Sequence, residues 1–309
     1  MVGHGDDWRL DFVVSPIDGV RDLLEGRDSG SVSIVSGGPA GVFEPSHPDL
    51  REGQIGHANR YLLTVVPPHR GGVDDPEGLV KEIGRDLPSE AYAPREFLSR
   101  SAILSRVRSL VEGTKAPAEM TVATILPTRP AKKGENRDLT PIIGDVARTR
   151  SHCGSSVMAA IQTFYSTLGV DAYLGVVRRT HAVLIAASSH SMRGGFVAFP
   201  IDESGKVIAR PFTAADFLTT TIADAPVDLF VAATGISETL VLEGVRFRDR
   251  SSVATHTLCL RSRTRSSRLI KHQHDLDRKR FHMLDRRSTK TLSFESVLDS
   301  LEKYVRTNA

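Results

Sequence analysis

The segment that decides the fold spans residues 11–20 and reads DFVVSPIDGV. Its apolar first half predicts a strand, and the Ser-Pro-Ile-Asp-Gly that follows is typical of a turn, because Asp and Gly favour turns for local hydrogen-bonding and backbone reasons. The segment places one carboxylate, that of Asp18, where the strand ends. Such a carboxylate either binds a metal ion or serves the turn alone, and the segment by itself leaves both interpretations open.

Composition bounds the class of protein. The chain has 309 residues, of which 40% are hydrophobic and 25% charged, which is typical of a soluble globular protein with one large or two moderate domains. Neither a signal peptide nor an apolar run long enough to span a bilayer is present, so we expect a cytoplasmic protein without a membrane partner. Two distant cysteines, Cys153 and Cys259, predict neither a disulfide framework nor a zinc cluster.

Apolar runs separated by turns and helical patterns run through most of the chain. Helical periodicity predicts helices over residues 95–111, from about 155 to 168, and 294–305, with a shorter one over 78–85. The GGPAG of residues 37–41 reads as a turn, and residues 253–272 read as a β-hairpin. Further strands are expected at residues 31–35, 61–66, 121–127, 171–177 and 227–235.

Helices that alternate with apolar strands favour an α/β fold with at least partly parallel strands. The loop-like composition of residues 69–95 suggests a boundary. We therefore expect an N-terminal lobe over residues 1–94, an α/β lobe with a C-terminal hairpin over 95–275, and a basic segment with a terminal amphipathic helix over 276–309.

Three collinear stretches together resemble the class II fructose-1,6-bisphosphatases of bacteria, a family whose members also act on sedoheptulose bisphosphate. The first begins at VGHG and ends at SPIDG, within residues 2–19; the second is AATGISETLVLEGVRFR, residues 232–248; the third is THTLCLRSRTRSSRLIKHQH, residues 255–274. Weaker matches cover residues 147–161 and 173–183. The resemblance thus extends over nearly the whole chain.

The resemblance implies a layered α/β/α/β/α sugar-phosphatase fold, shared with the lithium-sensitive phosphatases. It also implies hydrolysis of a sugar-phosphate monoester with Mg or Mn as cofactor, since carboxylates of the family hold divalent metal ions. Metal ions stabilise the charge of the phosphate and of the leaving alkoxide, and this reaction is among the slowest without a catalyst. A homo-oligomer or a paired paralogue is the partner that the family suggests.

Several family positions carry other residues in this chain. Ser15 stands at the first aspartate of the family's strand-end motif, whereas the second aspartate is retained as Asp18 and the threonine after the glycine is Val20. His181 stands at the family's glutamate ligand, and histidine suits zinc, iron or nickel better than magnesium. The Asp-Gly-Asp near the substrate sugar is replaced by Gly154, Ser155 and Ser156. The family's N-terminal metal-binding segment has no counterpart, so the chain reads as N-terminally shortened.

Each of these residues also has an ordinary structural interpretation. Asp18 suits a turn, and His181 suits a hydrogen-bonded position without any metal. Ser155 and Ser156 are typical N-caps, although the start of a helix can also bind a phosphate. Arg129, with two lysines close by, resembles a family segment loosely and is a candidate for the substrate phosphate. The basic stretch of residues 261–290 has a single aromatic residue, which argues against nucleic acid as a partner.

Three functions remain open from the sequence. The first is a divergent bisphosphatase-like protein with lost or strongly reduced activity that retains a sugar-phosphate pocket and requires no metal. The second is an active Mg- or Mn-dependent phosphatase with a rebuilt site. The third is a regulatory partner of an intact paralogue, or a repurposed biosynthetic enzyme, because function belongs to the site and not to the fold.

Overall fold

The structure is a computed structural model, and it describes only part of the chain. The described residues are 10–20, 24, 30–51, 60–67, 121–124, 148–151, 155–164, 170–201, 209, 211–222, 225–239, 241–247, 252–275, 280–284 and 291–293.

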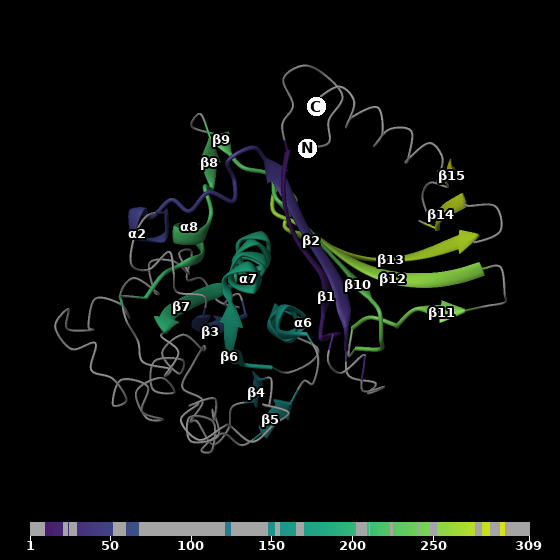
Figure 1. Cartoon of the computed structure of the whole chain (residues 1–309), viewed down its shortest axis with the longest axis horizontal. Coiled ribbons are helices and arrows are strands. Elements are labelled where there is room, and N and C mark those ends of the chain that lie inside the picture. The colour runs from purple at the N-terminus through teal and green to yellow at the C-terminus, as the bar shows by residue number, and fades with distance from the viewer. Residues whose placement is uncertain are drawn as a thin grey trace.

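A large antiparallel sheet forms one side of the molecule (Figure 1). Its strands pair in the order β1 (Leu10–Asp18), β2 (Val32–Pro39), β10 (Phe230–Gly235), β12 (Ser252–Arg261), β13 (Ser266–Asp275), β14 (Arg280–Leu284) and β15 (Thr291–Ser293). The short strand β11 (Arg246–Phe247) pairs with β12 beside this path. The hairpin expected at residues 253–272 is formed by β12 and β13, as the alternating pattern predicted.

A smaller, mixed sheet forms the other side. Its order is β5 (Arg148–Ser151), β4 (Thr121–Thr124), β6 (Ala172–Arg178), β3 (Arg60–Val66) and β7 (Gly195–Ile201). Strand β4 is parallel to both of its neighbours, whereas β3 is antiparallel to both of its own. The expectation of an α/β protein with partly parallel strands is confirmed.

Two helices lie between the sheets, as Figure 1 shows. Helix α6 (Ser156–Ile161) continues as a 3-10 turn, η2 (Gln162–Phe164), and packs against β4 and β6. Helix α7 (Arg179–Met192) contacts β1, β2, β10 and β12 of the large sheet and β3, β6 and β7 of the small one. Sheet, helix and sheet therefore form three layers, which correspond to the middle of the expected five; the two outer helical layers stay a prediction.

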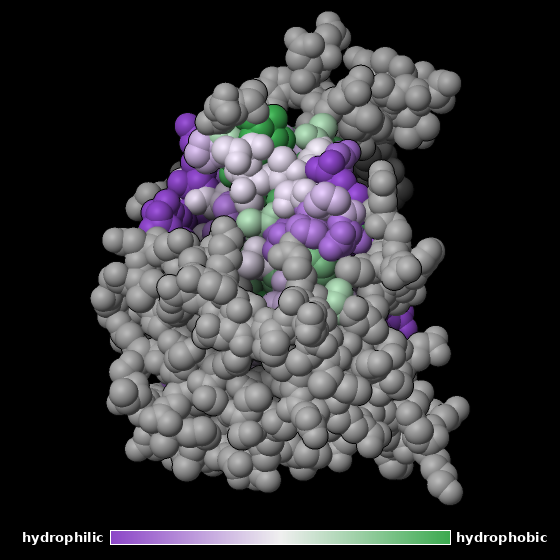
Figure 2. Space-filling view, turned by 90° about the vertical axis from the view of Figure 1, so that its left-hand side faces the viewer, coloured by the Kyte–Doolittle hydropathy of each residue, from purple (hydrophilic) through white to green (hydrophobic). Residues whose placement is uncertain are grey.

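The remaining short elements lie beside the small sheet. They are α2 (Pro48–Arg51), α8 (Ala214–Phe217) and the ribbon of β8 (Thr221–Ile222) and β9 (Ala225–Pro226). Three aromatic rings, those of Tyr61, Phe196 and Phe212, surround Phe217 in edge-to-face contacts and anchor α8. Figure 2 shows this side of the molecule, where hydrophilic residues border a small apolar area. Within the described residues no helix has both the length and the apolarity to cross a membrane.

Two turns lie elsewhere than the sequence predicted. The first half of GGPAG is strand, because β2 continues to Pro39 and the turn begins at Ala40. Gly37 belongs to the sheet because the rings of Phe12 and Phe230 fill the space that a side chain would take. Likewise β1 continues through Asp18 with an irregularity between Ser15 and Asp18, and the chain turns at Gly19, whose φ is 87°.

Helix α7 was not predicted as a helix, whereas the strands expected near residues 61–66, 121–127, 171–177 and 227–235 are present with slightly different ends. The helices expected over residues 78–85, 95–111 and 294–305 lie outside the described residues. Strands from residues 1–94 and from 95–275 occur together in both sheets, so the two proposed lobes share their sheets. Their boundaries remain a prediction.

Candidate functional site

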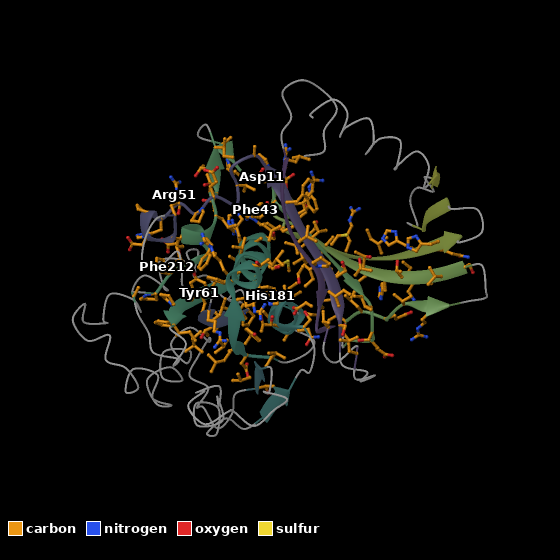
Figure 3. The ribbon with its side chains drawn as sticks, viewed as in Figure 1. Asp11, Phe43, Arg51, Tyr61, His181 and Phe212 are labelled. Atoms are coloured by element: carbon orange, nitrogen blue, oxygen red, sulfur yellow. The ribbon has the colours of Figure 1, made fainter. Side chains whose placement is uncertain are left out.

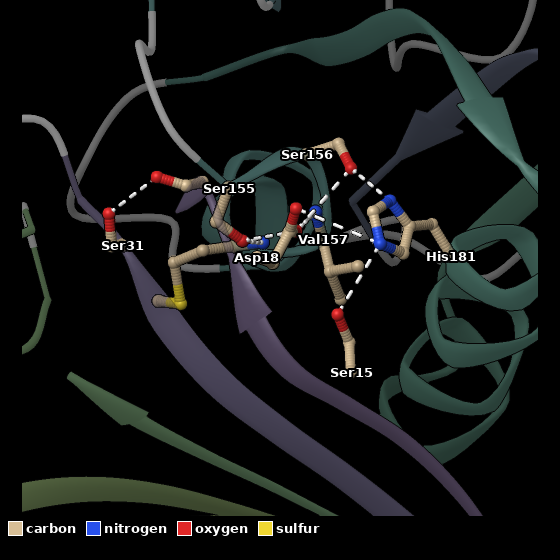
Figure 4. A network of polar contacts seen from close by, with 9 residues as sticks. Ser15, Asp18, Ser31, Ser155, Ser156, Val157 and His181 are labelled. Carbon is tan, nitrogen blue, oxygen red and sulfur yellow. Dashed lines mark hydrogen bonds and ion pairs between the residues drawn. The ribbon is translucent and has the colours of Figure 1, made fainter. Parts of the chain in front are cut away.

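Three elements meet at one polar cluster between the sheets: the end of β1, the start of α6 and the first turn of α7. Strand β1 contributes Ser15 and Asp18, α6 contributes its first turn with Ser155 at the N-cap, and α7 contributes His181. Figure 3 shows His181 in the interior beside α6, and Figure 4 shows the whole network. The structure therefore brings together residues that lie up to 166 positions apart.

The Asp18 carboxylate caps helix α6. Its Oδ2 accepts hydrogen bonds from Ser155 Oγ at 2.7 Å, from the Val157 N–H at 3.1 Å and from Ser156 Oγ at 3.4 Å. Asp18 is 5% exposed, so these bonds are shielded from water. A carboxylate at this end also interacts favourably with the helix dipole. The one acidic residue retained in the motif thus satisfies the start of a helix of the same chain.

Ser155 is the N-cap of α6, as the serine pair at a helix start predicted. Its Oγ accepts a hydrogen bond from the Met158 N–H at 2.9 Å and donates its own proton to Asp18. Both functions of the hydroxyl are therefore used within the protein.

His181 contacts all the other side chains of the cluster except Ser155. Its Nδ1 lies 2.9 Å from Ser156 Oγ, and its Nε2 lies 3.4 Å from Ser15 Oγ and 3.7 Å from Asp18 Oδ1. The His181 side chain is 22% exposed, more than its neighbours. The carboxylate beside Nε2 favours the tautomer with its proton on Nε2, which leaves the Nδ1 lone pair for the Ser156 hydroxyl.

Tyr173, which the sequence did not single out, lies fully buried near this cluster. Its ring lies along β6 over Gly175, where a side chain would collide with the phenol. Among the described residues its hydroxyl has no hydrogen-bond partner. Burial and, second, the charge of Asp18 raise the pKa of Tyr173 far above its ordinary value, so the phenol is neutral. A buried tyrosine two residues before a glycine of the same strand gives no sequence signal of this kind.

The donor set does not match magnesium or manganese. These ions take several hard oxygen ligands in near-octahedral geometry. Here one carboxylate oxygen is engaged by three donors, and the other faces an imidazole nitrogen. In the described part of the chain, no three His, Cys, Asp or Glu side chains are grouped as a metal site would need.

The structure shows no contact with the cluster for the other candidate residues that it describes. Val20 is 45% exposed, and Arg129, Gly154 and Cys153 lie outside the described residues. Cys259 is a free thiol on β12. In the HQH run the rings of His272 and His274 stack with centroids 6.1 Å apart, and His274 Nε2 lies 3.0 Å from Thr255 Oγ1.

The fold and the cluster together define an α/β protein whose candidate site lies where two sheets meet the starts of two helices. The family model described as bacterial fructose-1,6-bisphosphatase, glpX-encoded, matches residues 137–274. That region of the chain is similar to the class II bacterial fructose-1,6-bisphosphatases, as the motifs predicted, and this similarity is consistent with the mixed α/β architecture. The matched region holds Ser155, Ser156 and His181, and the structure adds Ser15 and Asp18 from outside it.

Proposed function

We propose that this fructose-bisphosphatase-like protein has lost metal-dependent phosphatase activity, or retains it only weakly, and still binds a sugar phosphate. The observation that carries the proposal is the bonding of Asp18, whose Oδ2 is held by three donors at the start of α6. The family match supports a sugar phosphate as the ligand class.

The replaced positions support the same conclusion by their charge. A metal-dependent phosphatase needs anionic oxygens that hold the cations, and the cations in turn neutralise the phosphate and the leaving oxygen. Ser15 contributes a neutral hydroxyl and His181 an imidazole. The described cluster therefore offers one anionic oxygen outside the cap of α6, Asp18 Oδ1, which faces His181 Nε2. One such oxygen is a weak magnesium site.

The proposal that the protein binds a sugar phosphate rests on two residues. Ser156 and Arg129 are the residues proposed to contact the phosphate, whereas the Ser155 hydroxyl is already used in capping α6. A cytoplasmic location, and assembly as a homo-oligomer or with a paralogue, complete the proposal.

The alternative is an active phosphatase with a rebuilt site. The observation in its favour is that Asp18 Oδ1 and His181 Nε2 lie 3.7 Å apart, a separation that one transition-metal ion could bridge. With this pair of ligands, the alternative would make the activity depend on zinc and not on magnesium or manganese.

Phosphate release decides between the two. The purified protein and its Ser15→Asp/His181→Glu variant are incubated with fructose and sedoheptulose bisphosphates in Mg, Mn or Zn, and released phosphate is measured. An ordinary enzyme turns over about 10 times per second. We expect the unchanged protein to be far slower than this, and the variant to gain activity with Mg. Ordinary turnover by the unchanged protein would overturn the proposal.

Ligand binding is measured separately. Calorimetric titration with the same sugars in EDTA should give heat and a raised thermal midpoint, because a ligand that binds the folded state stabilises it. The absence of both effects would remove the binding claim and leave the loss of activity standing. A Ser36→Ala variant is the control and should bind the sugars as the unchanged protein does, because the Ser36 hydroxyl bonds the Phe230 carbonyl within the large sheet and not the cluster.

A further inference from the structure

We propose that Ser156 is a nucleophile, activated by His181 and positioned through Asp18, that hydrolyses an uncharged carboxylic ester without a metal ion. This goes beyond the phosphatase family, whose chemistry depends on metal-bound phosphate. It rests on the way the three side chains contact one another.

The geometry is that of a nucleophile, a base and a residue that orients the base. Ser156 Oγ lies 2.9 Å from His181 Nδ1, within the range of a nucleophile and its general base. The opposite nitrogen, Nε2, lies 3.7 Å from Asp18 Oδ1. Serine and carboxylate thus lie on opposite nitrogens of one ring, which is the arrangement of roles in a Ser-His-Asp triad.

Asp18 selects the productive tautomer. A carboxylate beside Nε2 stabilises the proton there, and it would also stabilise the imidazolium that forms when Nδ1 takes a second proton. Asp18 itself is fixed by hydrogen bonds from Ser155 Oγ and the Val157 N–H at the start of α6, so the base is oriented by a rigid group.

Of the three serines of the cluster, Ser156 has the best position. The Ser155 hydroxyl donates to Asp18 and accepts from the Met158 N–H, so it has no contact with the imidazole. Ser15 Oγ is 3.4 Å from Nε2, on the side that carries the proton, and at the limit of a hydrogen bond. Only the Ser156 hydroxyl faces the nitrogen that can accept its proton.

The reaction balances with water as the sole co-reactant. Ser156 Oγ forms a bond to the ester carbonyl carbon while its proton passes to His181 Nδ1. The bond from that carbon to the leaving oxygen then breaks, and this oxygen takes the proton from Nδ1 as an alcohol departs. Water then gives a proton to Nδ1 while its oxygen bonds to the acyl carbon. The bond from that carbon to Ser156 Oγ breaks, Oγ takes the proton back from Nδ1, and a carboxylic acid departs.

An uncharged ester is compatible with the charge of the cluster. The Asp18 carboxylate lies within the network, and the nearest arginine on α7, Arg179, donates to the Leu50 carbonyl away from it. A carboxylic ester carries no charge until the tetrahedral intermediate forms, so the Asp18 carboxylate does not repel it. The neutral Tyr173 phenol, near enough for Asp18 to raise its pKa, is a hydrogen-bond donor without a partner among the described residues.

A fluorophosphonate probe tests the nucleophile directly, because the hydroxyl of an activated serine attacks its phosphorus, an Oγ–P bond forms and fluoride leaves. The folded, full-length protein is treated with the probe in EDTA, and the modified peptide is identified by mass spectrometry. We expect modification at Ser156. An unlabelled protein that still shows its thermal transition, or a label on another residue, would overturn the proposal.

Single substitutions test the separate functions of Ser156 and His181. Ser156→Ala should abolish both the label and the protein-dependent release of 4-nitrophenol from 4-nitrophenyl acetate. His181→Gln should lower the labelling rate about 100-fold or more. The matched control is Ser188→Ala, which removes another buried hydroxyl, one that bonds the Leu184 carbonyl on the same helix as His181. Equal labelling of the Ser156→Ala and Ser188→Ala variants would refute the assignment.

Asp18 acts through His181 and needs a readout of its own. In nitrogen NMR spectra of the histidine ring, the unchanged protein should show the proton on Nε2 of His181, and Asp18→Asn should shift the population toward the other tautomer. An unchanged spectrum in a folded Asp18→Asn variant would exclude the positioning function.

Discussion

Asp18 Oδ2 accepts from a hydroxyl, a backbone N–H and a second, longer hydroxyl contact, all from the first turn of α6. These bonds join strand β1 to a helix that begins 138 residues later. At the scale of single residues, this carboxylate therefore has a structural function that accounts for its burial, whether or not the site has a reaction.

Replacing Asp18 by alanine should lower the free energy of unfolding by about 2–3 kcal/mol, because buried donors would lose a charged acceptor. The measurement is urea unfolding followed by circular dichroism. Asp11→Ala is the matched control: Asp11 Oδ2 accepts one hydrogen bond, from the Gly41 N–H at 2.6 Å, and its loss should cost about 1 kcal/mol. Equal losses in the two variants would mean that Asp18 does not hold α6.

The sequence could indicate which residues belong to the candidate site but not which of them form hydrogen bonds with one another. Asp18 followed by glycine and Ser155 at a helix start are local signals, and the structure places both in the cluster. The bond between His181 and Ser156 depends on the packing of α7 beside α6, which no local pattern contains. The Tyr173 phenol near Asp18 depends on packing in the same way.

At the scale of elements, helix α7 shows why periodicity fails for a central helix. It contacts strands of both sheets, and nearly all its residues from Ala182 to Ser191 are buried. A helix that is apolar on every side has no amphipathic stripe, so its pattern resembles that of a buried strand. Five of its nine buried residues are small: three are alanines, and two are serines whose hydroxyls bond carbonyls of the preceding turn. Their small size lets two sheets approach the helix closely.

Truncations on opposite sides of α7 should therefore both be costly. Val183 and Ile185 lie about 200° apart around the helix axis, and both are buried. We expect Ile185→Ala to lower the free energy of unfolding by about 2–5 kcal/mol and Val183→Ala by at least about 1 kcal/mol. Leu269→Ala on β13, where the side chain is 50% exposed, is the control and should change stability by less than about 1 kcal/mol. A helix with one solvated side would give a large loss in only one of the two variants.

At the scale of the molecule, the fold joins distant parts of the chain. Strands β1 and β2 complete the sheet of β10, β12 and β13, and β3 lies between β6 and β7. The family match, residues 137–274, includes β6, α7, β10 and the hairpin but not β1, β2 or β3. The strands were predictable from apolar runs, whereas their order was not, because neighbours such as β2 and β10 are separated by nearly 200 residues.

Titratable groups on the large sheet, on its adjoining loops and on α7 fall into two sets. Burial alone would raise the pKa of Asp228, but hydrogen bonds from Arg261 and the Arg263 N–H, with both arginine charges, lower it below its ordinary value. The hydrogen bond from Lys271 lowers the pKa of Glu243. Both carboxylates therefore remain charged well below neutral pH, and their contribution to stability is lost only when the pH falls through these lowered values.

The histidines should dominate the pH dependence of stability between pH 7.5 and 5.5. Burial is the largest cause that lowers the pKa of His190, His256, His272 and His274, with a further contribution from Arg265 at His190 and from His272 at His274. Each binds a proton less readily when folded than in the unfolded chain, where the pKa is about 6.5. Above the pKa of the unfolded chain these histidines are neutral in both states and do not oppose folding. As the pH falls through that pKa toward the lower pKa of the folded protein, the free energy of unfolding decreases.

We therefore expect the thermal midpoint to be lower at pH 5.5 than at pH 7.5, as measured by scanning calorimetry at constant ionic strength. The double variant His272→Gln/His274→Gln should show a smaller drop, because two of the groups that favour the unfolded state on protonation are gone. Added salt should leave most of the drop in place, since desolvation and not a screened charge pair is its main cause. A midpoint that rises on acidification would show that carboxylate or imidazolium pairs outweigh these buried rings.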